Sequence, residues 1–125
     1  MTLVVNFSVR KSQHFDRDMN RIHAFMVSAE YESNTIKHIF EEIYISMKRL
    51  ETMPYIGADL SNKTAIPNDY RYLMSKQYLI FYKVFEKEKI VRVYHVYHSK
   101  EPYLLKLGQK SRTPGLTGEN IMWPQ

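Results

Sequence analysis

The chain has 125 residues and a net charge of +5, with 18 Lys and Arg against 13 Asp and Glu. This length fits one domain with a single modest core, and the complete lack of cysteine excludes disulfides, thiolate nucleophiles and cysteine-ligated metals. No apolar run is long enough to span a membrane and Met1–Arg10 does not resemble a signal peptide, so we expect a soluble cytoplasmic protein without membrane association.

The N-terminal half of the sequence predicts one strand and two amphipathic helices. The run 3–9 is short, apolar and rich in β-branched residues, which is typical of a strand. Apolar residues then recur at alternating steps of 4 and 3, which places them on one face of a helix over 13–30 and again over 34–53. Pro54 is expected to end the second helix, because a proline disfavours the helical conformation of the residue before it.

The C-terminal half predicts a sheet. A loop over 55–69 is followed by strands at 70–74, 78–85 and 90–97, with a charged turn at 86–89 between the last two. The middle strand carries apolar or aromatic side chains on both faces, as a central strand requires.

These elements define the expected fold class. It is an α+β domain of order β-α-α-β-β-β: an N-terminal strand, an antiparallel two-helix hairpin, and a three-stranded antiparallel sheet segment. The helix residues expected to be buried, with Ile80 or Phe81 beneath them, are Ile22, Phe25, Phe40, Ile43 and Leu50.

The domain is expected to span 1–107. From Gly108 onward the sequence is polar and rich in residues that break regular structure. We therefore expect 108–125 to be a flexible or loosely docked tail.

Several segments resemble a known family. The run 47–57 (MKRLETMPYIG) is similar to the "L-x-x-x-P-x-x-G" segment that ends the helical hairpin of RelE-like and ParE-like toxins. The runs 70–73, 78–84 and 92–98 resemble the last three strands of these proteins, and the likeness covers roughly residues 3 to 107. The resemblance implies the toxin of a bacterial type II toxin–antitoxin system, inhibiting growth and neutralised by a cognate antitoxin.

Two activities occur in the family that the chain resembles. RelE-like members cleave messenger RNA on the ribosome without a metal, and ParE-like members are described as poisoning DNA gyrase. RelE-like members usually carry an arginine directly after the aromatic residue that opens the middle strand, whereas here Leu79 follows Tyr78. The resemblance is thus closer to the ParE-like branch, which implies a toxin that binds a target such as DNA gyrase. The alternative is a ribosome-dependent mRNA endoribonuclease, and a third reading is a small basic binding module that retains only the fold.

The candidate site residues gather near the end of the last strand. Cleavage of RNA needs a base, a cation for the phosphate and an acid for the leaving oxygen. If the protein is a ribonuclease, the candidates for these catalytic roles are His95, His98, Lys100 and Tyr103. The alternative is that both histidines are ordinary structural residues of an aromatic strand.

A second group of candidates could bind a phosphate or an acidic helix. These binding residues are Arg71, Lys76, Arg92 and Tyr97. The alternative for the three cations is a solvated face of the sheet.

No cofactor or metal is expected. His14, His23 and His38 lack a convergent spacing with acidic residues, and no glycine-rich phosphate loop is present. The expected partner is an acidic antitoxin segment that adds a helix or a strand to the surface, because the chain is basic and its aromatic strands need cover.

Overall fold

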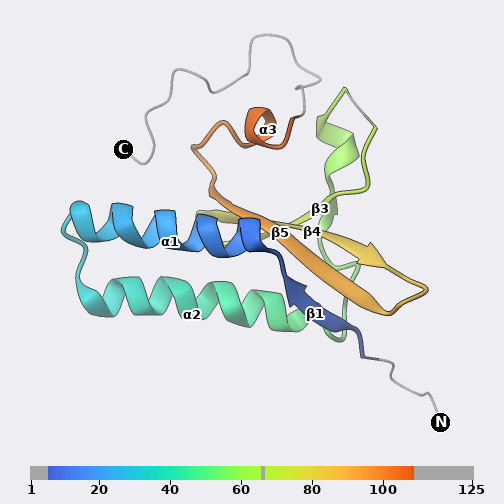
Figure 1. The fold of residues 1–125 in the computed structure, drawn as a ribbon, viewed down its shortest axis with the longest axis horizontal. Helices are drawn as coiled ribbons and strands as arrows, with labels where there is room; N and C mark the ends of the chain where they lie inside the picture. Colours follow the sequence, from blue (N-terminus) through green and yellow to red (C-terminus); the bar gives the residue numbers. More distant parts are fainter. Residues whose placement is uncertain (1–5, 66, 109–125) are drawn as a thin grey trace.

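A short strand and a helical hairpin form the N-terminal part of the structure. The computed structural model describes residues 6–65 and 67–108. Strand β1 (Ser8–Lys11) leads into α1 (Gln13–Ser28), and α2 (Ser33–Arg49) runs back alongside it (Figure 1). The hydroxyl of Ser12 accepts a hydrogen bond from the backbone N–H of Phe15 (3.2 Å), so Ser12 caps α1.

The rest of the described chain builds the sheet and two short helices. Strand β2 (Ala58–Asp59) and the 3₁₀ helix η1 (Leu60–Lys63) precede the strands β3 (Arg71–Ser75), β4 (Tyr78–Phe85) and β5 (Ile90–His98), and a single turn, α3 (Tyr103–Lys106), follows. The sheet order is β1-β5-β4-β3-β2. Neighbouring strands are antiparallel except for β1, which pairs with β5 in parallel.

The predicted fold class is confirmed, with three differences in detail. The parallel pairing of β1 makes the sheet mixed, which the long connection between β1 and β5 permits. Strand β1 begins at Ser8, later than predicted, although residues 1–5 lie outside the described part of the chain. The predicted loop 55–69 also contains β2 and η1. All of the predicted tail except Gly108 lies outside the described residues.

Both helices end earlier than predicted. Helix α1 ends at Ser28, and Glu30 adopts a left-handed conformation (φ 60°) that turns the chain towards α2. Helix α2 ends at Arg49, and a turn follows in which the N–H of Met53 donates to the carbonyl of Arg49 (2.9 Å). Pro54 therefore follows a turn, and the prediction that it ends the helix directly is wrong.

The sheet has a different apolar layer on each face. Helices α1 and α2 pack on one face, where the fully buried residues include Ile22, Ile43, Leu50 and Ile80, while Phe25 and Phe40 are half-buried. Phe81 lies on the opposite face, in a smaller cluster with Leu60, Leu79 and Tyr97 that η1 and α3 flank. Strand β4 is thus covered on both sides, as predicted.

Gly57 explains the spacing of the Pro-x-x-Gly segment. Its backbone N–H donates to the hydroxyl of Tyr82 in the core (2.9 Å). A Cβ atom at this position would lie 2.5 Å from that hydroxyl and 2.7 Å from the carbonyl oxygen of Tyr72. Only glycine lets the loop approach the sheet so closely.

Candidate functional site

The site at the end of β5 is created where β1 leaves the sheet. The chain turns into α1 at Ser12, whose N–H donates to the carbonyl of Val93 (3.0 Å) and whose hydroxyl donates to that of Tyr94 (3.1 Å). Tyr94 lies in a register shift, because Tyr82 pairs with Val93 and Phe81 pairs with His95. Such a bulge re-aims the residues that follow it. Beyond the bulge, α1 replaces β1 beside the edge of β5.

A histidine–aspartate pair occupies this edge. Nδ1 of His95 lies 2.9 Å from Oδ2 of Asp18 on α1 and 2.8 Å from the hydroxyl of Tyr97. The same Asp18 oxygen accepts from the backbone N–H of Val96 (3.2 Å), so the carboxylate also satisfies the open strand edge. A carboxylate only accepts, so the proton of a neutral His95 belongs on Nδ1 and the lone pair on Nε2. Among the described residues, Nε2 has no hydrogen-bond partner.

Beside this pair lies an ion network centred on the fully buried carboxylate of Glu101. One of its oxygens lies 2.8 Å from a guanidinium nitrogen of Arg21 and accepts from Nζ of Lys106 (2.7 Å), and the other accepts from the backbone N–H of His98 (2.6 Å). Both cations also stand near the ring of Tyr97, at 5.8 and 5.4 Å from its centroid. Glu101 therefore joins α1, the end of β5 and α3. Tyr97 lies within this network, and its burial raises the pKa of its hydroxyl.

His98 points elsewhere and is engaged at both ring nitrogens. It is buried, its Nδ1 accepts from the backbone N–H of Lys100 (3.1 Å), and its Nε2 lies 3.3 Å from the side-chain oxygen of Gln77. Burial lowers the pKa of His98, with the Lys100 charge adding to the effect and Glu101 opposing it. This environment favours a neutral imidazole that holds the β5 end to the β3–β4 turn.

The other two catalytic candidates do not converge on His95 either. Lys100 is exposed in the turn after β5, and Tyr103 packs on Phe81 with ring centroids 5.6 Å apart. Nδ1 of His95, by contrast, lies within hydrogen-bond distance of both a carboxylate and a hydroxyl.

The four binding candidates are spread over the sheet. The guanidinium of Arg71 donates to the carbonyl of Gly57 (2.9 Å) and stands 5.0 Å from the centroid of the Tyr55 ring, so it clasps the loop before β2. Lys76 is exposed in the β3–β4 turn, and Arg92 is exposed on β5. Tyr97 belongs to the His95 site.

Sequence reasoning missed Asp18, Arg21, Glu101 and Lys106. The first two are three residues apart on α1, next to its apolar stripe, which is the one local signal that they lie near the sheet. Nothing local to Glu101 indicates a buried carboxylate, since its burial depends on cations from two other segments.

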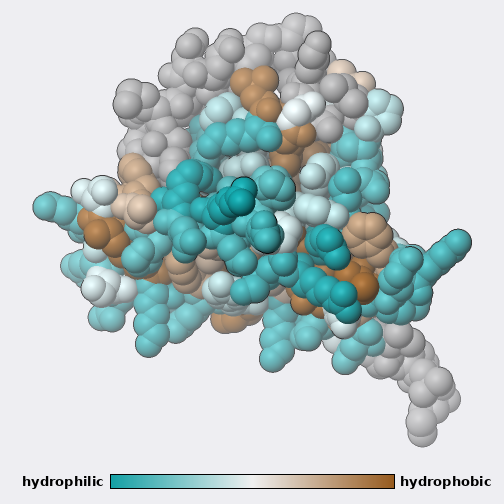
Figure 2. All heavy atoms as spheres, in the orientation of Figure 1, coloured by the Kyte–Doolittle hydropathy of each residue, from teal (hydrophilic) through white to brown (hydrophobic). Residues whose placement is uncertain are grey.

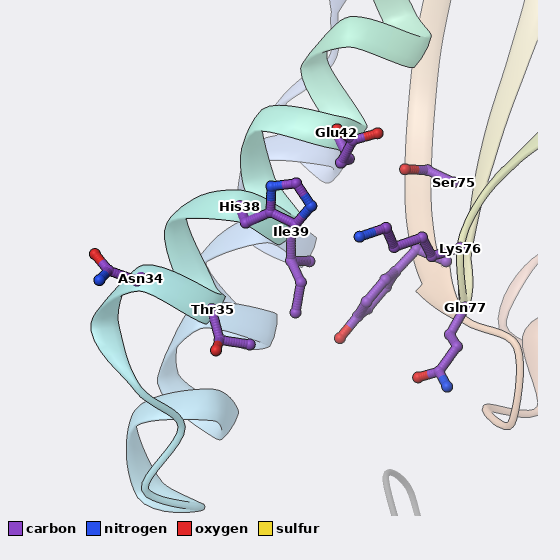
Figure 3. Close-up of a pocket in the computed structure, with 9 residues that line it drawn as sticks. Asn34, Thr35, His38, Ile39, Glu42, Ser75, Lys76 and Gln77 are labelled. Carbon is purple, nitrogen blue, oxygen red and sulfur yellow. The ribbon is translucent and has the colours of Figure 1, made fainter.

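A cleft lies on the other side of the hairpin, between α2 and the β3–β4 turn (Figure 3). Its volume is about 460 Å³. Figure 3 shows His38, Ile39 and Glu42 on α2 facing Ser75 and Lys76 across the gap. The cleft is thus apolar at Ile39 and Tyr78 and carries both signs of charge at its rim.

Neither a metal-binding cluster nor a membrane-spanning helix occurs among the described residues. They contain no group of three or more His, Cys, Asp or Glu side chains placed to hold a metal ion. Within the same residues, no helix has the length and apolar character needed to cross a membrane.

Comparisons with known proteins agree with this architecture. No curated protein sequence matches the chain. Among solved structures, the chain is similar to the chromosomal ParDE toxin–antitoxin system of P. aeruginosa (TM-score 0.59, 15% identity, covering 74% of this chain and 95% of that one). It is also similar to the RelBE2 toxin–antitoxin complex of Mycobacterium tuberculosis (TM-score 0.50, 13% identity, covering 78% and 97%). At such identities these likenesses show the fold.

The sequence itself places the chain in a family. Residues 9–103 match the family model described as the ParE toxin of the type II toxin–antitoxin system parDE. The match covers most of the chain, including the hairpin, all the long strands and the His95 site. The chain therefore belongs to the ParE toxin family of type II toxin–antitoxin systems.

Proposed function

We propose that this toxin inhibits growth by binding a target such as DNA gyrase, without cleaving RNA, and that a cognate antitoxin neutralises it. The observation that carries the first part is the environment of Leu79. Leu79 occupies the position where RelE-like relatives usually carry an arginine, and it is buried with Leu60, Phe81 and Tyr97. An apolar cluster cannot stabilise the charge of a phosphate in a transition state.

The positions of the remaining candidates also support a binding function. His98 is buried with both ring nitrogens engaged, and Lys100 and Tyr103 lie apart from His95. The two cations nearest Tyr97 are already paired with Glu101. A general base, a free cation and an acid are therefore not assembled around one point.

The alternative, a ribosome-dependent mRNA endoribonuclease, draws support from the Asp18–His95 pair. A carboxylate that orients an imidazole is the arrangement of a general base. His95→Gln removes this base, and His14→Gln is the matched control, because the exposed His14 ring lies 5.2 Å from that of His95.

The test expresses the toxin in a bacterial host and follows DNA damage and translation separately. In the host we expect DNA damage to appear before translation stops, while messenger RNA stays intact. We also expect the toxin to inhibit supercoiling by purified gyrase. His95→Gln should leave toxicity unchanged. Messenger RNA cleavage that is lost in His95→Gln and kept in His14→Gln would refute the binding mechanism.

For the antitoxin we propose the open edge of β3 and the neighbouring cleft. Strand β2 pairs only with Arg71 and Tyr72, so the outer edge of β3 from Leu73 to Ser75 has no strand partner among the described residues. Met74 on this edge is 60% exposed. An unpaired edge beside a cleft suits an added strand whose side chains enter the cleft.

Substitution of Met74 tests this proposal. We expect Met74→Asp to weaken the complex with the antitoxin by about tenfold or more, because the charge must be desolvated in the interface. Met53→Asp is the control, since Met53 is also exposed (48%) but lies after α2. Equal affinity of the two variants would exclude this edge as the binding site.

A further inference from the structure

No helix or loop of residues 6–65 and 67–108 covers the outer face of the sheet, opposite α1 and α2, at the end where β4 and β5 join. The helices pack on Val9, Val84 and Val91, so the residues that alternate with these point to the opposite side. The cluster beneath η1 and α3 covers only the other end of this face. In Figure 1 the β4–β5 hairpin projects away from α3 and from both long helices.

Three cations stand side by side on this uncovered surface. Arg10 on β1 is in register with Arg92 on β5, which is in register with Lys83 on β4. Residues paired in this way share a face, and neighbouring strands are about 4.8 Å apart, so the three form one continuous basic row. Figure 2 shows strongly hydrophilic side chains gathered over β1 and β5.

The basic row, defined as Arg10, Arg92 and Lys83, is incompletely neutralised. Lys83 has an ion pair with Asp69 (3.1 Å). Burial alone lowers the pKa of Lys83, but Asp69, Tyr70 and Tyr94 together raise it, so this residue stays charged. Within the described part of the chain, neither Arg10 nor Arg92 has an ion pair, and both are exposed. Like charges directly opposite each other destabilise a sheet, and a bound anion removes this cost.

We propose that the basic row docks an acidic helical segment of a protein partner. A helix crossing the strands presents carboxylates three and four residues apart at about 5–6 Å, close to the spacing of the strands. The next row towards the hairpin is Ile90 paired with Phe85, which is 36% exposed, so an apolar flank is available to the helix as well. The inference rests on the proposed function only in naming the antitoxin as the protein that supplies this segment.

The tyrosines beside the row favour a peptide over a nucleic acid. Stacking of bases requires open aromatic faces. Nζ of Lys83 stands 4.4 Å from the centroid of Tyr70 and 5.6 Å from that of Tyr94, and the two rings meet edge to face at 5.9 Å. These rings are therefore engaged with Lys83 and with each other, and the surface offers charge and apolar contact.

The experiment measures binding of the full-length toxin to two capped helical peptides of about 20 residues. One has glutamates on one face with leucines beside them, and the other has glutamine at each glutamate position. The toxin variants are Arg10→Ser/Arg92→Ser and the control Arg17→Ser/Arg49→Ser, which removes the same charge from exposed arginines on α1 and α2.

Of the two peptides, we expect only the glutamate peptide to bind. Arg10→Ser/Arg92→Ser should weaken its binding about tenfold, while Arg17→Ser/Arg49→Ser should change it by less than about twofold. An equal loss in both variants, or no binding of the glutamate peptide, would overturn the proposal. Tighter, Arg92-dependent binding of a 20-nucleotide single strand would also overturn it, in favour of a nucleic-acid surface. Failure of the proposed function would instead appear as the absence of growth arrest on expression without antitoxin, which this assay does not measure.

Discussion

The two ends of the outer sheet face differ in whether their charged side chains are paired. At the α3 end, the buried carboxylate of Glu101 is matched by Arg21 and Lys106 and by a backbone N–H. At the hairpin end, Arg10 and Arg92 face each other in register with no carboxylate of the described chain between them. The charged groups at the first end hold segments together, whereas Arg10 and Arg92 at the second end have no ion pair with another described residue.

This difference separates structural from functional charge. A buried carboxylate is tolerated only when its charge is compensated, so the α3 end reflects the demands of folding. An exposed pair of like charges costs some stability and can persist where binding compensates for it. Substitutions at the two ends should therefore change stability in opposite directions.

The largest effect is expected for Glu101→Ala. The variant leaves Arg21 and Lys106 without their shared carboxylate and removes the acceptor of the His98 N–H. Lys106 is about a third exposed and can regain water, whereas the terminal nitrogens of Arg21 are buried where they lose the carboxylate. We therefore expect the free energy of unfolding to fall by about 3 kcal/mol, as for a broken buried pair. Urea denaturation measures this change.

Glu88→Ala is the matched control. Glu88 is exposed in the β4–β5 turn, so its loss should change stability by less than about 0.5 kcal/mol. Similar values for the two variants would mean that the α3 end is no better compensated than the surface.

The elements of the fold differ in how well the sequence predicts them. Strand β4 is predicted residue for residue, because a short run of apolar and aromatic residues between turn segments is a local signal. The stripes of α1 and α2 predict their buried faces for the same reason, but the ends of both helices depend on turn geometry at Glu30 and Leu50.

The site is less predictable because it is assembled from distant segments. His95 could be chosen from its place on an aromatic strand, but its partner Asp18 lies 77 residues earlier on α1. The bulge at Tyr94, which turns His95 towards Asp18, has no clear mark in the sequence. The basic row likewise appears only once the register of β1 on β5 is known.

An intermediate effect is expected from His98 at acidic pH. Because burial lowers the pKa of His98 below its usual 6.5, the unfolded chain takes up a proton that the folded protein resists. Stability from this residue is therefore complete above pH 6.5 and decreases as the pH falls through the lower folded-state pKa.

Unfolding midpoints at pH 7.5, 6.5 and 5.5 measure this dependence. His98→Asn should flatten the decrease below pH 6.5, whereas His38→Asn, at the rim of the cleft, should leave it as in the parent protein. A slope that survives in His98→Asn would assign the acid sensitivity to another group.

The smallest effect, and the one of opposite sign, is expected for Arg10→Glu. The new carboxylate would lie opposite Arg92 on the neighbouring strand, so a repulsive pair becomes an attractive one. Cross-strand charge pairs contribute about 0.2–1 kcal/mol, so we expect the variant to be about 0.5 kcal/mol more stable than the parent, and the gain to shrink in high salt.

Arg17→Glu controls for the change in net charge, since Arg17 is exposed on α1 and has no ion pair among the described residues. The same stabilisation in both variants would reflect only the lower net charge of the protein, and a loss in Arg10→Glu would show that Arg10 supports the fold. A gain specific to Arg10→Glu, together with weaker binding of the acidic peptide, would show that the basic row is kept at the expense of stability.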